Sequence, residues 1–252
     1  MSLKVLVQMS KEIRLSSRSD PSKNHELLSL KICMKGLIFD RALANKIQAK
    51  NLRGAIATEN KDFVTFHHHT ETGSLVYRYP LIQYKMIENQ ACLIGIEQGA
   101  IEVEKIDLLG KSLNFGADND YVILEQRVHY YFSDFGLVPG KVGYEFLSPW
   151  LALNERNYEK YHRLGSWTKR KILLERILVG NIISMSKGLG YTVPGPIKVN
   201  ILTLKEVNTS LKRNPMLGFV GKFEVNFKIP DYLGIGKSVS RGFGTVKRLM
   251  VD

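Results

Sequence analysis

The sequence predicts an α+β fold built from two tandem ferredoxin-like (RRM-like, βαββαβ) domains. The chain has 252 residues, of which 44% are hydrophobic and 10% aromatic, enough for the core of one large domain or two small ones. Short stretches of alternating apolar and polar residues predict strands, and stretches with apolar residues at helical spacing separate them. A similar order recurs in the second half, so we expect two similar domains.

The first half begins with strand signals. A strand is predicted at 4–8, followed by a polar loop at 16–24, and strict alternation over 26–35 predicts a half-buried strand. Asp40 has the character of a helix N-cap and is followed by apolar residues at helical spacing, which predicts a helix over 40–53. The remaining elements of this half are strands at 63–69, 77–85, 91–97 and 121–132 and a helix at 99–109.

The second half repeats a similar pattern. A strand at 143–153 and helices at 154–162 and 167–187 are followed by strands at 197–205, 217–229 and 243–251. The turn-forming pair Pro139-Gly140 marks the expected linker. We therefore divide the chain into an N-terminal domain, 1–138, and a C-terminal domain, 139–252.

Charge is distributed unequally between the two halves. The whole chain carries 36 Lys and Arg against 24 Asp and Glu, a formal net charge of +12. Residues 1–135 hold 17 basic and 16 acidic side chains and residues 136–252 hold 19 and 8, so the halves carry +1 and +11. A surplus of this size is typical of a polyanion-binding surface, and it favours nucleic acid over an anionic membrane surface.

Several classes of protein are disfavoured by the sequence. No apolar run approaches the roughly 20 residues of a transmembrane helix, and the N-terminus has no signal-peptide pattern, so a cytoplasmic location is expected. Cys33 and Cys92 lie far apart in apolar surroundings and form neither a disulfide framework nor a metal or redox motif. No cofactor is predicted.

The most unusual segment is glycine-rich and spans residues 234–244. Gly234 and Gly236, five residues, then Gly242 and Gly244 allow close backbone approach to a phosphate. Two common nucleotide motifs do not fit, because a P-loop would need glycine at position 231 and a dinucleotide fingerprint would need it at 239. Those positions are occupied by aspartate and valine.

This double Gly-hydrophobic-Gly pattern near the C-terminus resembles the signature of the RAMP superfamily of CRISPR-associated proteins. Within it, the chain is similar to the endoribonucleases that cut CRISPR repeat transcripts into guide RNAs. The resemblance extends to a histidine-containing branch through Leu52-Arg53-Gly54, Phe66-His67-His68-His69, residues 77–85 (YRYPLIQYK) and Ile94-Gly95-Ile96. It implies two ferredoxin-like domains, with the glycine-rich loop in the second.

The histidine run suggests a cleavage chemistry. On a strand, His67 and His69 would point the same way and His68 the other way. One neutral imidazole can take the proton of a ribose 2′-OH while a protonated one donates to the leaving 5′-oxygen, without a metal. The resemblance maps a His-x-His pair onto His67 and His69, and a nearby tyrosine onto Tyr77 or, alternatively, Tyr79.

Other interpretations of these residues stay open. The pair could supply two metal ligands, although the third ligand is not evident, or the histidines could be structural or solvated. Arg53, Lys61 or Lys85 could stabilise charge on the phosphorane. His129, within a predicted strand, is expected to be a packed core residue.

The expected RNA-binding residues are the helical triplet and positions in and beyond the glycine-rich segment. Phosphates are the expected target of the cations. The alternative for the triplet is a solvated helix face. The full set is Lys169, Arg170, Lys171, Gly234, Gly236, Lys237, Arg241, Gly242, Gly244 and Arg248.

The sequence thus predicts a metal-independent, sequence-specific endoribonuclease. It would bind CRISPR repeat RNA and cut precursor transcripts into guide RNAs, leaving 2′,3′-cyclic phosphate and 5′-OH ends. The alternative is a noncatalytic RAMP subunit that holds guide RNA in an effector complex. Besides the RNA, other CRISPR effector subunits and a second copy of the chain are candidate partners, and no membrane partner is expected.

Overall fold

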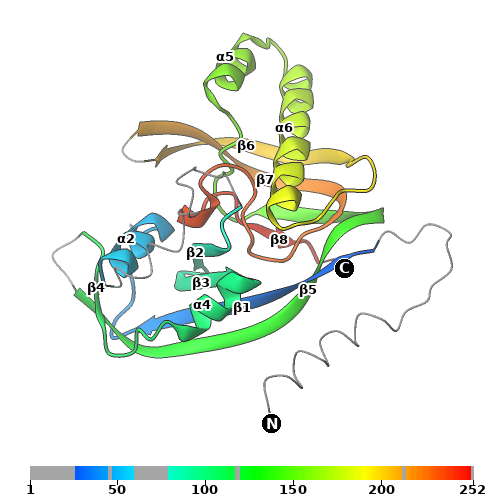
Figure 1. Cartoon of the computed structure of the whole chain (residues 1–252). Helices are drawn as coiled ribbons and strands as arrows, with labels where there is room; N and C mark the ends of the chain where they lie inside the picture. The colour runs from blue at the N-terminus through cyan, green and yellow to red at the C-terminus, as the bar shows by residue number, and fades with distance from the viewer. Residues whose placement is uncertain (1–25, 45–46, 60–78, 117–119, 212–213, 251–252) are drawn as a thin grey trace, which may run out of the picture.

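The computed structural model describes residues 26–44, 47–59, 79–116, 120–211 and 214–250. The predicted strands at 4–8 and 63–69 and the loop at 16–24 lie outside these ranges, as do Lys61, His67, His69 and Tyr77. The strands of the described residues form one eight-stranded sheet, whose two halves share one very long strand, β5 (Figure 1).

The first half has the ferredoxin-like strand order. Strand β1 (Leu28–Phe39) lies between β3 (Gln90–Ile96) and β5 (Asp120–Phe146), and β2 (Ile82–Ile87) lies outside β3, all antiparallel. Helices α2 (Ala49–Glu59) and α4 (Gln98–Lys105) complete the βαββαβ order, with a short β4 (Ser112–Asn114) added before β5. If the four main strands are numbered 1 to 4 along the chain, their order across the sheet is 2-3-1-4.

The first helix begins later than the expected 40–53. The Asp40 carboxylate does not cap a helix, because Oδ1 accepts a hydrogen bond from the Val122 amide at 3.1 Å and thereby holds the end of β1 against β5. The helix begins at Ala49, preceded by a capping interaction in which the Gln48 amide donates to Asn51 Oδ1 at 3.0 Å. The prediction was wrong because Asp40 bonds to a strand that is distant in sequence.

The second half repeats the strand order around the C-terminal part of β5. Strand β7 (Asn214–Lys228) lies between β5 and β6 (Val199–Leu211), and β8 (Val246–Arg248) pairs with the other edge of β5. Helices α5 (Glu155–Arg163) and α6 (Trp167–Gly188) follow β5, close to their predicted ranges. The strands predicted at 143–153 and 243–251 are shorter, because the chain turns away after Phe146 and forms a loop before Val246.

Strand β5 crosses the position of the expected linker. Pro139 and Gly140 lie within this 27-residue strand, so the turn expected at this position was wrong. The β5–β7 register shifts between Leu137 and Val142, and such an irregularity accommodates a proline that has no amide proton for the ladder. A turn signal can therefore lie inside a strand where the register with its partner shifts. The division into domains at 138/139 stays a prediction.

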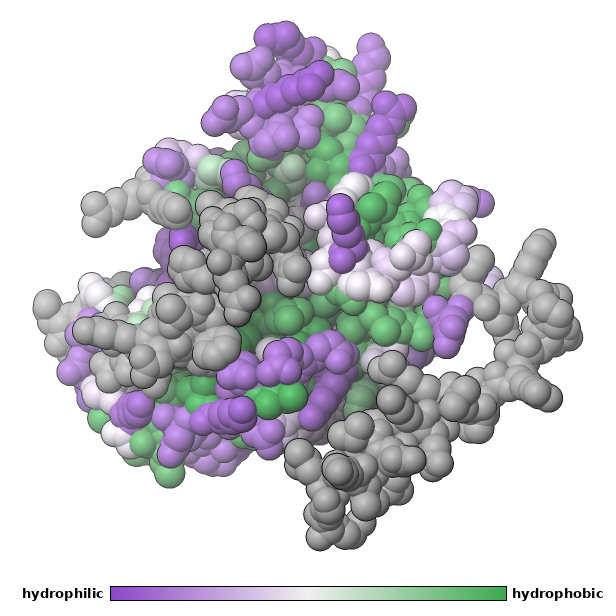
Figure 2. Space-filling model, viewed as in Figure 1, coloured by the Kyte–Doolittle hydropathy of each residue, from purple (hydrophilic) through white to green (hydrophobic). Residues whose placement is uncertain are grey.

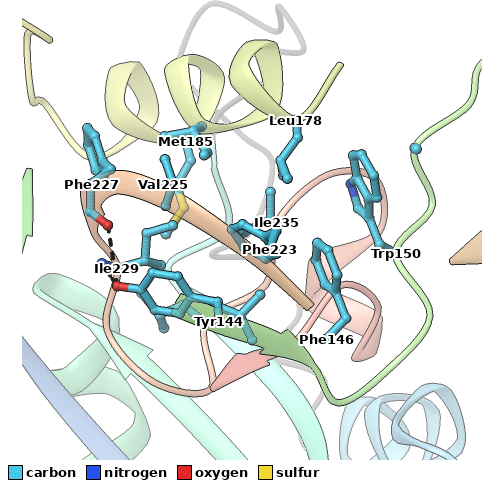
Figure 3. Packing of buried hydrophobic residues seen from close by; sticks show 14 of the residues in the cluster. Tyr144, Phe146, Trp150, Leu178, Met185, Phe223, Val225, Phe227, Ile229 and Ile235 are labelled. Atoms are coloured by element: carbon cyan, nitrogen blue, oxygen red, sulfur yellow. Dashed lines mark hydrogen bonds between the residues drawn. The ribbon is translucent and has the colours of Figure 1, made fainter. Parts of the chain in front are cut away.

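The main hydrophobic core extends across both halves. It joins Ile32 and Ile94 of the first half to the aromatic residues of the second. Figure 3 shows Leu178 and Met185 of α6 facing Phe223 and Ile235. A second core lies under α2 and α4 around Leu52 and Val103. No helix in the described ranges has the length and apolar character needed to span a membrane.

His129 is exposed, which contradicts the expectation of a packed core residue. It lies on β5, where the strand pairs with β1 on one side, and its ring is 5.6 Å from that of Tyr131. The periodicity of an edge strand does not show which of its faces is covered, and here nothing in the described chain buries the imidazole.

Candidate nucleic-acid interface

The glycine-rich segment replaces the helix that would connect the last two strands of the second half. Between β7 and β8 the chain forms only a short 3₁₀ helix, η2 (Val239–Arg241). In Figure 1 this segment lies between the two halves, beside α2. It contributes Ile235 to the core, beside Leu233 just before the segment, and both are fully buried. The segment is therefore a packed part of the fold that also reaches the surface.

The glycines of this segment are required by close contacts. Gly236, Gly242 and Gly244 have φ values of +93°, +87° and +62°, a region that glycine adopts without strain. A Cβ on Gly244 would lie 2.0 Å from the Ile235 carbonyl oxygen, and one on Gly242 would lie 2.3 Å from Ala49 Cβ. The Gly-hydrophobic-Gly pairs thus fix a compact loop against α2 and the core.

Strand β2 of the first half, together with Tyr79 just before it, forms hydrogen bonds to this loop and to Thr245, the residue that follows it. The Tyr79 hydroxyl donates to the Gly234 carbonyl at 2.7 Å, and Gln83 Oε1 accepts from the Gly234 amide at 3.0 Å. Lys85 Nζ donates to Thr245 Oγ1 at 3.0 Å. Gln83 and Lys85 are fully buried, and their i,i+2 spacing puts them on one face of β2.

These contacts assign a structural task to much of the motif at 77–85. Burial raises the pKa of Tyr79 and lowers the pKa of Lys85 to about 7. Tyr79 and Lys85, both considered as groups that could assist cleavage, are here bonded to the loop. The sequence signal for Gln83 and Lys85 is two polar residues at alternate positions of a predicted strand.

The exposed side of the loop carries positive charge. Lys237 is exposed, and Arg241 lies near Arg53 of α2, whose Nη1 is 3.5 Å from Ser240 Oγ. Burial and the charge of Arg241 lower the pKa of Arg53. Within the described residues no carboxylate forms an ion pair with these three cations. An anionic group bound here would relieve the repulsion between the two guanidinium groups.

The structure does not bring the Lys169–Arg170–Lys171 triplet to this loop. The triplet begins α6, whereas α6 meets the loop at Asn181, which accepts from Trp150 Nε1 beside Gly236. Along the helix, Lys171 and Asn181 are separated by about 15 Å. Arg170 Nη1 lies 3.8 Å from Glu206, and Lys171 Nζ donates to Asn200 at 3.1 Å. A role of the triplet in RNA binding stays a prediction.

Arg248 is also separate from the loop's cationic side. It is exposed at the end of β8, where its amide donates to Asp231 Oδ1 at 2.7 Å. Its contribution to RNA binding stays a prediction as well.

The histidines lie outside the described residues, but the residues that flank them are well defined. The chain leaves α2 at Glu59 and returns at Tyr79. Helix α2 packs on the loop through Ala49, and Tyr79 bonds to it through Gly234. Both ends of the 60–78 segment are therefore anchored on elements that contact the glycine-rich loop. The described residues contain no cluster of three metal-ligating side chains.

Two ferredoxin-like halves with a glycine-rich loop held between them define the class of RAMP proteins with the Cas6 fold. The family model for the Cas6b C-terminal domain matches residues 137–249, and that for the Cas6b N-terminal domain matches residues 30–131. The chain belongs to the Cas6b family.

Solved structures and a curated relative agree with this assignment. The crystal structure of a Cas6b has a TM-score of 0.76 and 38% identity, covering 88% of this chain and all of the other. A second, described as the CRISPR RNA processing endoribonuclease Cas6b, has a TM-score of 0.69 and 36% identity over the same shares. An uncharacterized protein of Methanocaldococcus jannaschii is 50% identical over 118 residues, 47% of this chain and 80% of that protein.

Proposed function

We propose that this chain is an endoribonuclease that binds CRISPR repeat RNA and cuts precursor transcripts into guide RNAs. The observation that carries the proposal is the Cas6b relationship, which includes a structure described as a CRISPR RNA processing endoribonuclease and covers 88% of this chain. The cations beside the glycine-rich loop form no ion pair with a carboxylate of the described chain, and they support an RNA substrate, since phosphates are their natural ligands.

In this proposal the RNA backbone lies along the loop between the two halves. Lys237, Arg241 and Arg53 contact phosphates, and the second half supplies most of the net charge that attracts the strand. Positioning a single phosphodiester beside the 60–78 segment requires a rigid support, and the clamp from Tyr79, Gln83 and Lys85 supplies it.

The cleavage step is a transesterification without a metal. The ribose 2′-oxygen loses its proton to one histidine and forms a bond to the adjacent phosphorus, while the bond from phosphorus to the 5′-oxygen breaks. The second histidine gives its proton to that oxygen. The products are a 2′,3′-cyclic phosphate and a 5′-OH. His67 and His69 are the proposed pair, in unassigned order, with Tyr77 assisting.

The test uses purified protein and labelled CRISPR repeat RNA in EDTA. The normal substrate is compared with one whose scissile 2′-OH is replaced by hydrogen. We expect cleavage of the first alone, with a cyclic phosphate end. Cleavage of the deoxy substrate would contradict the 2′-OH mechanism. Tight binding of both substrates without cleavage would overturn the enzymatic proposal and leave a guide-RNA-holding subunit.

A further inference from the structure

A cavity of about 740 Å³ lies between α5 and the β6–β7 hairpin, next to the glycine-rich loop. One face of α5 lines it, with Glu155, Tyr158, Glu159 and His162 at i, i+3, i+4 and i+7. The opposite wall is the hairpin, and Lys237 of the loop closes one side. In Figure 1 α5 stands above the hairpin, and Figure 2 shows polar side chains gathered over α5 and the beginning of α6.

The α5 wall is aromatic and accessible. The rings of Tyr158 and His162 have centroids 4.4 Å apart, and Tyr158 is 47% exposed. Exposed aromatic rings beside a cavity are suited to stacking a flat ligand. Leu211, Met216 and Leu217 of the hairpin add apolar surface on the other side.

The hairpin also contributes a carboxylate that is held in place. Glu206 Oε1 accepts from the Tyr161 hydroxyl at 2.6 Å and lies 3.8 Å from Arg170 Nη1. Tyr161 is fully buried. In the described part of the chain, no donor bonds to Glu206 Oε2. The cavity therefore contains a fixed carboxylate whose Oε2 is available to a ligand, and Oε1 keeps a second lone pair that can accept a further hydrogen bond.

Charge and shape together point to a nucleobase. The glutamates Glu155, Glu159 and Glu206 repel a phosphate from the cavity, whereas Lys237 can hold one at its edge, beside the loop. Asn154, Asn208 and Asn214 offer amide groups to the polar edge of a base. The volume of the cavity lies in the range typical of small-ligand sites.

We propose that this cavity binds the base of an unpaired guanosine, stacked on Tyr158 and donating from its Watson–Crick edge to Glu206. Guanine presents two adjacent donors, N1–H and the 2-amino group, to a carboxylate, whereas uracil has one N–H between two carbonyls. Through Lys237 the site continues the RNA path of the proposed function, on which this inference rests. It would fix the register of the RNA before cleavage.

The first experiment measures binding of free nucleotides, separately from any cleavage. Calorimetric titration compares 5′-GMP with 5′-IMP, which lacks the 2-amino group, and with 5′-UMP. We expect affinity to fall in the order GMP, IMP, UMP. Tyr158→Ala should weaken GMP binding roughly 5- to 150-fold through lost stacking, and Glu206→Gln should remove most of the preference for GMP over UMP.

Two matched controls keep the result specific. Lys160 lies on α5 and Glu145 on β5, both outside the cavity lining. The variants Lys160→Ala and Glu145→Gln should bind GMP as the parent does. Equal binding of GMP and UMP, or no effect of both cavity variants, would overturn the inference. Because Glu206→Gln conserves shape, it tests the site even where Tyr158→Ala fails to fold.

A second experiment locates the base within the RNA. Each unpaired guanosine of the repeat is replaced in turn by inosine, and RNA binding is measured with the parent and with Glu206→Gln. Inosine at one position should weaken RNA binding to the parent protein but not to Glu206→Gln. Cleavage of the repeat without any such position would refute the cavity proposal and leave the proposed function intact. Selective GMP binding without any cleavage would refute the proposed function and leave the cavity proposal intact.

Discussion

The two halves of this molecule share a strand order but differ in the connection before the last strand. In the first half α4 makes this connection and packs on its own sheet. In the second half the glycine-rich loop makes it, and β2 of the first half holds that loop through buried polar groups. The halves also differ in charge, with nearly all of the excess in residues 136–252.

The same fold therefore uses two different connections before its last strand, a helix in one half and a glycine-rich loop in the other. In the first half, the helix before the last strand packs on its own sheet. A loop that needs a neighbouring strand makes the second half depend on the first. The glycine-rich loop consequently lies at the boundary between the two halves.

The largest effect is expected from the histidines of the first half. His67→Ala or His69→Ala should lower the rate of repeat cleavage by roughly 10²- to 10⁴-fold, because each removes one of the two groups proposed to transfer a proton. RNA binding, measured by filter retention, should be unchanged. His68→Ala is the matched control, since its side chain is predicted on the opposite face and the rate should persist. A large rate loss in the control alone would contradict the assignment.

The next effect concerns the glycines of the loop. Gly244→Ala should destabilise the protein by at least about 3 kcal/mol in urea unfolding, since it combines a positive φ with a close contact to the Ile235 carbonyl. Gly110→Ala in the first half is the comparison, because φ there is +71° but nothing lies within 4 Å. Its cost should be about 1–2 kcal/mol. Equal costs would show that the loop tolerates a side chain.

The lowered pKa of the buried Lys85 should make the stability of the protein depend on pH. Its pKa of about 7 in the folded protein lies below the ordinary lysine value, so the unfolded chain binds more protons between pH 7 and 10.5. The free energy of unfolding should therefore rise with pH across that range, by up to about 1.4 kcal/mol per unit from this group. In Lys85→Met this contribution should vanish, as shown by urea unfolding at several pH values. Parallel pH profiles for the parent and the variant would contradict it.

The smallest effect is expected for the cations of the loop. Lys237→Ala combined with Arg241→Ala should weaken RNA binding about tenfold and reduce the slope of log K against log salt by about 1.4, as for two lost phosphate contacts on a single strand. Arg127→Ala in the first half is the control, since Arg127 pairs with Glu125 at 2.7 Å. An unchanged slope in the double variant would mean that the RNA passes elsewhere.

Much of the local structure was predictable because it depends on short-range periodicity. Helix α6 spans Trp167–Gly188 against an expected 167–187, and α5 and β1 lie close to their predicted ranges. The spacing of the four glycines identified the loop, since close backbone approach imposes it. The Lys169–Arg170–Lys171 triplet was identified too, but its distance from the loop was not, because helical spacing does not say which sheet a helix end will meet.

The sequence by itself determined most of the described strands and helices, the glycine pattern and the placement of charge in the second half. These follow from side-chain periodicity, backbone freedom and composition, all of which are local properties. Only the tertiary structure decided that β5 runs through Pro139 and Gly140, that Gln83 and Lys85 clamp the loop, and that α5 and the β6–β7 hairpin enclose a cavity. Each of these depends on contacts between residues far apart in the chain, which no local pattern specifies.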